Sequence, residues 1–308
     1  MNEFYIVLKQ LIQLFIIFGI GAWAMKQSII TDRDLPFISR LIGKVLIPIF
    51  IYMNIIKEGS FAKLVEYFPA LYLSILVYGL LIVIFYAIAK LAKFELNHSR
   101  VFQGVFIFIN VGFIGFPIMF SLYPQDGPLY VAWITLVDQF LLWTYGVFLT
   151  SGQKQFKLMQ MFNPPTYALI LAIITIALGI KPPELISKAL WNLSSTATPL
   201  CMVYMGAMFY LVKPFWVLKS WEVYVGIGVK MVLLPLLIGL GIHNLDLPAS
   251  MKGTFIVLAA LPPMILIPMI VPETSKEKPF AIGATLVGIV ACLFTIPLVL
   301  YLHHLLVG

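Results

Sequence analysis

The sequence predicts an all-α polytopic membrane protein with ten transmembrane helices. Three observations support this fold class: hydrophobic residues make up 61% of the chain, charged residues make up only 11%, and the apolar residues fall into long runs. Soluble domains contain roughly 45–50% apolar and about 25% charged residues. A soluble core could not bury this much apolar surface, so lipid must be the solvent for most of it.

Each half of the chain holds five runs that approach the roughly 20 mostly apolar residues needed to cross a bilayer. The gaps between the runs leave no room for a soluble domain. We therefore expect a first five-helix repeat at 1–150, a short cytoplasmic linker at 151–163 and a second, inverted five-helix repeat at 164–308. The expected spans are 5–25, 35–55, 67–90, 101–122 and 129–150, then 164–180, 193–212, 223–242, 253–271 and 280–302.

The first run predicts a retained span and not a cleaved signal peptide. It lacks a positively charged start, and it continues to about Met25, which is too long for the apolar segment of a signal peptide. The sixth run, at 164–180, is the shortest of the ten. Cys201 and Cys292 both lie inside apolar runs, so they read as small buried hydrophobic residues and indicate no disulfide framework.

The distribution of basic residues predicts the orientation. The net charge of +7 comes from Lys and Arg scattered between the apolar runs, with no dense patch that would indicate a nucleic-acid partner. Alternate gaps hold thirteen basic residues in one set and five in the other. The basic-rich loops of membrane proteins face the cytoplasm. We therefore expect a multi-pass protein of the cell membrane with both termini outside the cytoplasm, with Arg40 and Lys44 snorkelling inward.

The two halves carry similar features at corresponding positions. The second and seventh runs each contain a proline followed by a Tyr-Met pair. Because five spans is an odd number, the second half must be inverted relative to the first. The fourth and ninth runs are interrupted, by Gly112, Gly115 and Pro117 in one and by Pro262 and Pro263 in the other. Matched breaks in inverted halves indicate the substrate site of a transporter.

A break inside a spanning helix has chemical consequences. Proline removes a backbone hydrogen bond, and in lipid the freed groups must find protein, water or ligand partners. The exposed half-helix ends suit ions, with anions favoured at the N-terminus and cations at the C-terminus. A single membrane proline usually only kinks its helix. Two matched breaks, one beside Asn110, favour a substrate site.

The residues at the breaks resemble those of the auxin efflux carriers, including the plant PIN-FORMED proteins. Asn110-Val-Gly-Phe-Ile-Gly115-Phe-Pro117 is similar to the first crossover segment of that family, and Ala260-Leu-Pro262-Pro263 to the second. Val45-Leu-Ile-Pro48 and Met205-Gly-Ala-Met-Phe209 also fit. The resemblance covers nearly the whole chain. One departure is Pro263, where the plant pattern has a polar residue.

This resemblance implies two inverted five-helix repeats whose broken fourth and ninth helices cross beside the substrate. It also implies elevator-like transport of a small organic anion, with Asn110, Pro117 and Pro262 at the site, and it is compatible with a homodimer. Bacterial relatives suggest dicarboxylates such as malate or malonate, whereas the plant branch implies indole-3-acetate-like acids. The chain lacks the long central loop of many plant members, so it resembles a compact bacterial form.

Asp138 lies near the middle of the fifth run, where burying a charge is costly and indicates function. Helical spacing places Thr135, Gln139 and Tyr145 on roughly the same face, which predicts a polar stripe toward the bundle. A carboxylate there could carry a coupling proton or help to bind Na⁺. Alternatively, it is a structural carboxylate bonded to a neighbouring helix.

Two further polar residues have open roles. Lys230, in the eighth run, could neutralise a carboxylate substrate, pair with Asp138 or support packing. Asn54, at the end of the second run, either lines the cavity or caps the helix at the interface.

Other functional classes fit the sequence less well. A membrane enzyme would need clustered acids or a nucleophile with a base beside it, and the spans show neither an acidic pair nor a central histidine. A channel or receptor would not explain the paired breaks. A sodium-coupled carrier resembling the bile-acid symporters is the alternative within the transporter class. We expect no metal and no cofactor, with H⁺ or Na⁺ as the coupling ion.

Overall fold

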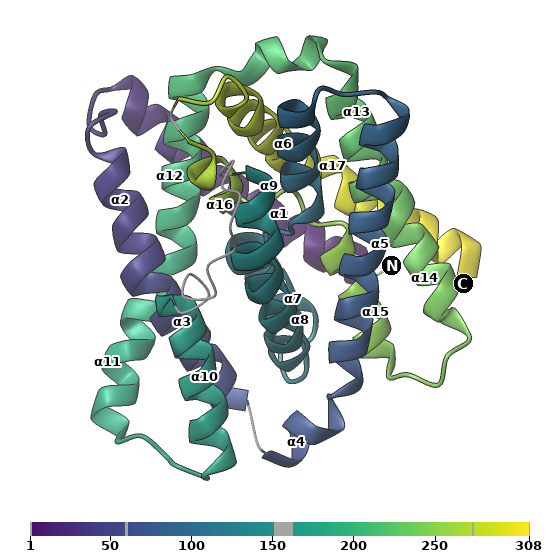
Figure 1. Cartoon of the computed structure of the whole chain (residues 1–308). Helices are drawn as coiled ribbons and strands as arrows, with labels where there is room; N and C mark the ends of the chain where they lie inside the picture. The colour runs from purple at the N-terminus through teal and green to yellow at the C-terminus, as the bar shows by residue number, and fades with distance from the viewer. Residues whose placement is uncertain (1, 59–60, 151–162, 273, 308) are drawn as a thin grey trace.

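The structure, a computed structural model, describes residues 2–58, 61–150, 163–272 and 274–307 (Figure 1). The described residues form helices, with one isolated β-bridge between Ile109 and Pro263, which confirms the all-α prediction. Of the expected linker at 151–163, only Asn163 belongs to the described residues. The rest of this expected linker lies outside the described residues.

Seven helical segments in the described part of the chain are long and apolar enough to cross a membrane. Each corresponds to an expected span, and four of them are built from consecutive shorter helices. Four ranges come from the first half and three from the second. They are Phe4–Lys26, Leu35–Lys57, Pro69–Leu91, Gly127–Thr150, Glu184–Val212, Trp221–His243 and Lys278–Leu306.

These seven segments consist of the following elements. In the first half they are α1 (Asn2–Lys26), α2 (Leu35–Leu41), η1 (Ile42–Leu46), α3 (Ile47–Glu58), α5 (Pro69–Leu91), α8 (Gly127–Leu141), η3 (Leu142–Gly146) and α9 (Val147–Thr150). In the second half they are α11 (Glu184–Ser195), α12 (Ala197–Val212), α13 (Trp221–Gly228), η6 (Val229–Leu233), α14 (Leu234–His243) and α17 (Lys278–Val307). The segment that corresponds to the seventh expected span begins at Glu184, earlier than the expected 193, because α11 leads into α12.

The other three expected spans are shorter or divided. The sixth is α10 (Pro164–Ala177), whose first turn is capped by the Asn163 side chain accepting from the Thr166 amide. The fourth is divided into α6 (Leu96–Ile107) and the continuous pair η2 (Val111–Gly115) and α7 (Phe116–Leu122). The ninth is divided into α15 (Ala249–Ala259) and α16 (Leu266–Ile270). Within the part of the chain that the structure describes, two short helices lie outside the spans, α4 (Phe61–Glu66) and η5 (Pro214–Lys219).

The break in the fourth span lies at Phe108–Asn110, before the Gly112–Pro117 segment and not within it. The backbone is extended at Phe108, with φ −82° and ψ 138°, and the helix resumes at Val111. Pro117 is the second residue of α7 and stands inside a continuous helical segment. The expectation that Gly112, Gly115 and Pro117 interrupt the span is therefore wrong in position.

Three of the prolines in the spans follow a widened helical turn. The π-turns η1, η2 and η6 each end two residues before a proline, at Pro48, Pro117 and Pro235. In each turn the amide just before the proline bonds the carbonyl five residues back, for example Phe116 to Val111. The proline ring clashes with the preceding turn and cannot donate, so the helix opens by one residue there. Such turns often mark functional segments.

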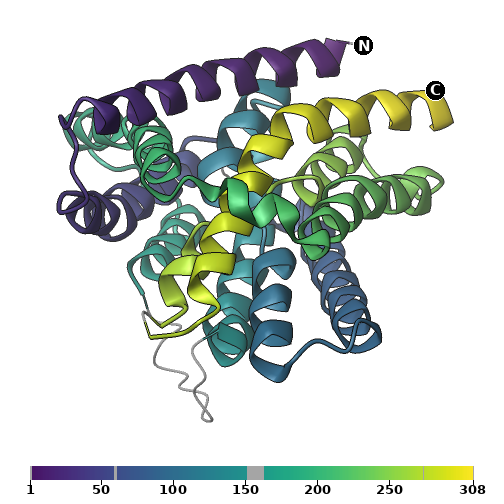
Figure 2. The same ribbon diagram turned by 90° about the horizontal axis from the view of Figure 1, so that it is seen from above.

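Helices α1 and α12 pack closely along the first and seventh spans. A side chain at Gly21 would meet the Val203 backbone, and one at Gly206 would meet the Phe18 carbonyl. Small residues allow this close approach of backbones, which drives helix association in lipid. The N-terminal end of α1 and the C-terminal end of α17 lie near each other in both Figure 1 and Figure 2.

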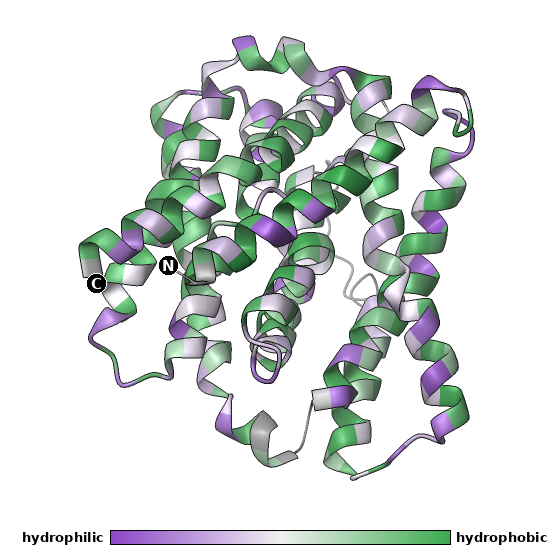
Figure 3. Cartoon of the chain, turned by 180° about the vertical axis from the view of Figure 1, so that it is seen from behind, coloured by the Kyte–Doolittle hydropathy of each residue, from purple (hydrophilic) through white to green (hydrophobic). Residues whose placement is uncertain are grey.

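The surface matches a lipid environment. Large apolar side chains such as Leu91, Val83 and Phe294 are well exposed on the long helices. Figure 3 shows hydrophobic residues along most helical turns and hydrophilic ones gathered mainly at helix ends and loops. An aqueous solvent would penalise this much exposed apolar surface. The fold is that of a multi-pass membrane protein.

Candidate functional site

The two broken spans meet at their breaks. The Asn110 amide donates to the Pro262 carbonyl over 3.0 Å, and the Met264 amide donates to the Phe108 carbonyl over 3.2 Å. Together with the bridge between Ile109 and Pro263, these bonds form a short antiparallel pairing. Backbone groups in a membrane interior must be satisfied within the protein. Each break therefore supplies the hydrogen bonds that the other lost.

Two buried charges hold the first break from the side. Lys230 is fully buried, and its Nζ donates to the carbonyls of Phe106 and Phe108 over 3.1 and 3.0 Å. Asp138 accepts hydrogen bonds from the Tyr78 hydroxyl and from the Ile109 amide. The two opposite charges also attract each other. In the first break, the Phe106 and Phe108 carbonyls thus bind the positive Lys230, and the Ile109 amide binds the negative Asp138.

A cavity of about 330 Å³ opens beside the paired breaks. Its size falls within the range of roughly 300–1,000 Å³ that is common for small-molecule sites. Its walls come from the second span, the first break and η2, the fifth span, the start of α10 and the segment before α16. The charged and polar residues among its lining are Ser39, Arg40, Lys44, Asn110, Thr135, Asp138, Gln139 and Asn163.

Asn110 is the one polar group in this cavity wall that is both buried and unsatisfied. Its side chain is 1% exposed, and neither Oδ1 nor Nδ2 has a hydrogen-bond partner among the described residues. Leaving a buried polar group unpaired costs about 1–3 kcal/mol. Next to it, a side chain at Gly112 would meet open space. The η2–α7 helix begins at Val111, whose amide donates to the Ile109 carbonyl, and a helix start leaves further first-turn amides without intrahelical partners. The site offers donors and an acceptor to a ligand.

Charges of both signs border the cavity. Arg40 and Lys44 line it from the second span and are exposed, whereas Asp138 lies buried in the opposite wall. Lys230 adds a positive charge behind the break. The exposed Arg40 and Lys44, together with the buried Asp138 and Lys230, give the surroundings of the cavity a net positive charge, which favours an anion.

The polar stripe of the fifth span reaches the cavity in part. Thr135, Asp138 and Gln139 all line it. The Gln139 side chain donates to Asp138 over 3.3 Å and accepts from the Trp143 indole over 3.1 Å. Tyr145, the fourth residue of the stripe, does not line the cavity and instead donates to Gln103 of α6 over 3.3 Å.

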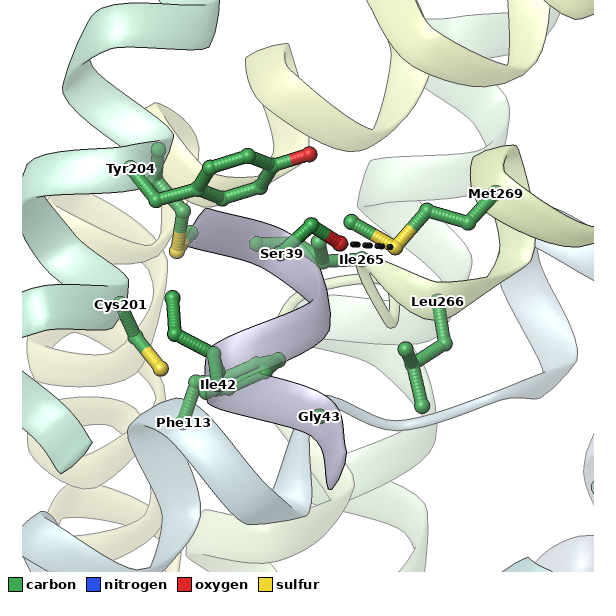
Figure 4. A pocket seen from close by; sticks show the side chains of 10 residues that line it. Ser39, Ile42, Gly43, Phe113, Cys201, Tyr204, Ile265, Leu266 and Met269 are labelled. Carbon is green, nitrogen blue, oxygen red and sulfur yellow. Dashed lines mark hydrogen bonds between the residues drawn. The ribbon is translucent and has the colours of Figure 1, made fainter. Parts of the chain in front are cut away.

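A second space of about 10 Å³, enough for about one water molecule, adjoins the cavity (Figure 4). Ser39 and Gly43 line both spaces, so this part of the second span is the partition between them. Across the smaller space, the Ser39 hydroxyl donates to the Met269 sulfur over 3.4 Å, and Cys201 faces it from α12 (Figure 4).

Several expected site residues have other positions. Asn54 is 2% exposed, donates to the Phe50 carbonyl of its own helix over 2.7 Å and does not line the cavity. Gly115 is buried where a side chain would meet Leu261. Pro117 is half-buried within α7. Of the two prolines of the second break, Pro262 accepts from Asn110 and Pro263 packs against Gly288, yet neither lines the cavity.

Other cavity and break residues were not anticipated from the sequence. Arg40 and Lys44 were visible as basic residues inside an apolar run, but they were interpreted as snorkelling groups. Trp143 and Met264 carry no sequence signal that separates them from packing residues. Tyr78 lies 60 residues from Asp138 along the chain, in a span with no other feature, so only the structure reveals their contact.

The fold and this cavity define a helical membrane protein with a small-molecule site at paired helix breaks. A sequence profile of the family described as "Membrane transport protein" matches residues 6–160 and 152–300. An uncharacterized transporter of Methanocaldococcus jannaschii is 26% identical over 200 residues, which cover 61% of this chain and 64% of that protein. The chain belongs to this membrane transport protein family, which contains the auxin efflux carriers. By family it is a membrane transporter. The region aligned with the Methanocaldococcus jannaschii transporter spans less than two thirds of that protein.

Proposed function

We propose that the protein is a secondary active transporter that moves a small organic anion across the cell membrane by elevator-like alternating access. The observation that carries this proposal is the unsatisfied Asn110 amide in a cavity of about 330 Å³ beside two paired helix breaks. Binding sites at discontinuous helices are typical of secondary carriers. The family membership supports transport, and the site chemistry supports the substrate class.

The cavity chemistry favours a carboxylate. The Asn110 amide can donate to one carboxylate oxygen, and the η2–α7 helix start provides backbone donors and a partial positive charge. Arg40 and Lys44 at the cavity wall attract the anion from solvent. A cavity of this volume accommodates both candidate classes, dicarboxylates such as malate or malonate and indole-3-acetate-like acids.

The architecture that we propose for transport has two inverted five-helix repeats at 1–150 and 164–308, with α6–η2–α7 and α15–α16 as the crossover helices. The pairing of Asn110 with Pro262 and of Phe108 with Met264 supports corresponding roles for the two breaks. The closeness of the two chain ends supports both termini lying on one side of the membrane. A homodimer in the cell membrane completes this proposal.

Counterflow distinguishes a carrier from a channel. Proteoliposomes loaded with unlabelled carboxylate are expected to accumulate the same labelled acid transiently, because one alternating site exchanges the two pools. Dissipation of the label without transient accumulation would favour a channel.

Imposed proton and sodium gradients in the same vesicles compare the two coupling ions, and Asp138→Asn tests the proton role of that carboxylate. Unchanged stimulation by a proton gradient in Asp138→Asn would exclude that role.

A further inference from the structure

Lys230 is brought to the first break by close helix packing. One turn before it, Gly226 of α13 lies directly on the Phe106 ring, where any side chain would overlap the ring atoms. Residues four apart share a helix face, so this contact directs Lys230 toward α6 as well. The widened turn η6 (Val229–Leu233) contains Lys230. The position of the amine is thus set by two features of its own span.

The groups around the Lys230 amine are oxygen ligands. The carbonyls of Phe106 and Phe108 accept from Nζ over 3.1 and 3.0 Å, and the Asp138 carboxylate attracts it. Carbonyls at the end of α6 (Leu96–Ile107) have no further turn to bond, and they carry the partial negative charge of a helix C-terminus. Unwound carbonyls combined with half-helix C-termini are the ligands that coordinate Na⁺ in coupled transporters.

We propose that the Lys230 ammonium is a tethered cation that occupies a Na⁺-type site at the first break, so that the protein needs no sodium ion there. The amine supplies a positive charge near Asp138, and its two hydrogen bonds occupy the Phe106 and Phe108 carbonyl oxygens that a second cation would need. As applied to transport, this inference rests on the proposed function. As a statement about cation binding, it does not depend on it.

Removal of the amine is expected to turn this place into a sodium site. Methionine is one heavy atom shorter than lysine, so Lys230→Met vacates the space of the ammonium and leaves the apolar stem nearly intact. Asp138 then becomes a buried carboxylate without a counter-charge, which is a strongly unfavourable state. A small monovalent cation that enters from solvent restores the balance and stabilises the folded protein in proportion to its binding.

The test compares thermal unfolding of the purified full chain in sodium chloride and in choline chloride at equal ionic strength, together with radiolabelled sodium binding. Wild type and Lys230→Arg are expected to show no sodium-specific rise in Tm and no saturable sodium binding. Lys230→Met is expected to gain both, and Asp138→Asn/Lys230→Met to lose them again. Lys252→Met is the matched control, because Lys252 also donates to a carbonyl, that of His243 over 2.7 Å, but at an exposed position.

Lys230→Gln provides a second variant should the methionine variant fail to fold, since its amide still donates to the carbonyls while the charge is gone. It too is expected to gain sodium-specific stabilisation. Saturable, Asp138-dependent sodium binding by the wild type would overturn the proposal. So would indifference to sodium in every neutral Lys230 variant that folds.

Uptake measurements separate this inference from the proposed function. Wild-type uptake is expected to be the same in sodium and choline, whereas sodium should stimulate Lys230→Met by about 10-fold, within the usual range of coupling between two sites. Failure of the wild type to transport any carboxylate would contradict the proposed function and leave the sodium-binding result standing. Sodium-stimulated wild-type uptake would contradict the tethered cation and support a sodium-coupled carrier.

Discussion

The backbone amide of Asn110 donates to the carbonyl of Pro262 over 3.0 Å, and this bond joins the two broken spans of the protein. It leaves the Asn110 side chain, which has no partner among the described residues, facing the cavity. The backbone of Asn110 therefore serves the fold while its side chain remains available to a ligand. This separation makes the residue suitable for mutational tests.

Asn110→Ala is expected to weaken substrate binding without weakening the fold. The loss of one or two hydrogen bonds to a charged ligand should lower the affinity by about 10- to 100-fold, whereas Tm should stay unchanged or rise because a buried unpaired amide is removed. Asn54→Ala is the matched control, since that buried amide bonds its own helix. Binding by scintillation proximity and unfolding in detergent measure the two effects. A destabilised Asn110→Ala with normal affinity would contradict the assignment.

Asp138→Asn is expected to destabilise the protein because it leaves the Lys230 charge buried and unpaired. Breaking a buried pair costs about 3–5 kcal/mol. Asp138→Asn/Lys230→Met should be less destabilised than the sum of the two single variants, because the second change removes the orphaned charge. A double-mutant cycle by chemical denaturation in detergent measures the coupling. Additive effects would show that the two charges act independently.

Gly206→Ala is expected to loosen the packing of α1 on α12. The added methyl group would meet the Phe18 carbonyl, and overpacking of this kind costs about 1–3 kcal/mol. Gly19→Ala, on α1, meets nothing and should be neutral or slightly stabilising. Thermal unfolding of both variants makes the comparison. Equal stability of the two would argue against the close approach at Gly206.

Neutralising Arg40 and Lys44 together is expected to raise the KM for an anionic substrate by several-fold at low salt. Such charges at the edge of a site attract the ligand mainly at long range, so the effect should shrink as salt screens it. Arg33→Gln removes an exposed positive charge outside the cavity and serves as the control. Initial uptake rates at two ionic strengths measure the change. An unchanged KM in the double variant would show that Arg40 and Lys44 do not attract the substrate.

The sequence predicted the long spans well because bilayer thickness dictates their length. The expected ranges 35–55, 129–150 and 223–242 correspond to Leu35–Lys57, Gly127–Thr150 and Trp221–His243. It also predicted which spans are divided, although the first break lies at Phe108–Asn110 and not at Pro117. The extended segment contains no proline or glycine, and its shape depends on pairing with residues around Pro262, more than 150 positions away.

The contacts of the site were harder to predict than its location. Lys230 bonds two backbone carbonyls, Phe106 and Phe108, that lie 124 and 122 residues away. Every residue has a backbone carbonyl, so the sequence does not indicate which two carbonyls bond Lys230. Asn54 and Asn110 illustrate the same limit, since both are asparagines inside apolar runs. Only the structure shows that one bonds its own helix and the other faces the cavity.

The most direct test of the central claim is uptake of a panel of labelled carboxylates into proteoliposomes, with wild type, Asn110→Ala and Asn54→Ala compared side by side. A carrier with its site at the paired breaks should show saturable, gradient-dependent uptake of at least one acid by wild type and Asn54→Ala, and a strong loss in Asn110→Ala. Equal uptake by all three would contradict the assigned site. No uptake of any acid by folded wild-type protein would contradict the anion carrier itself.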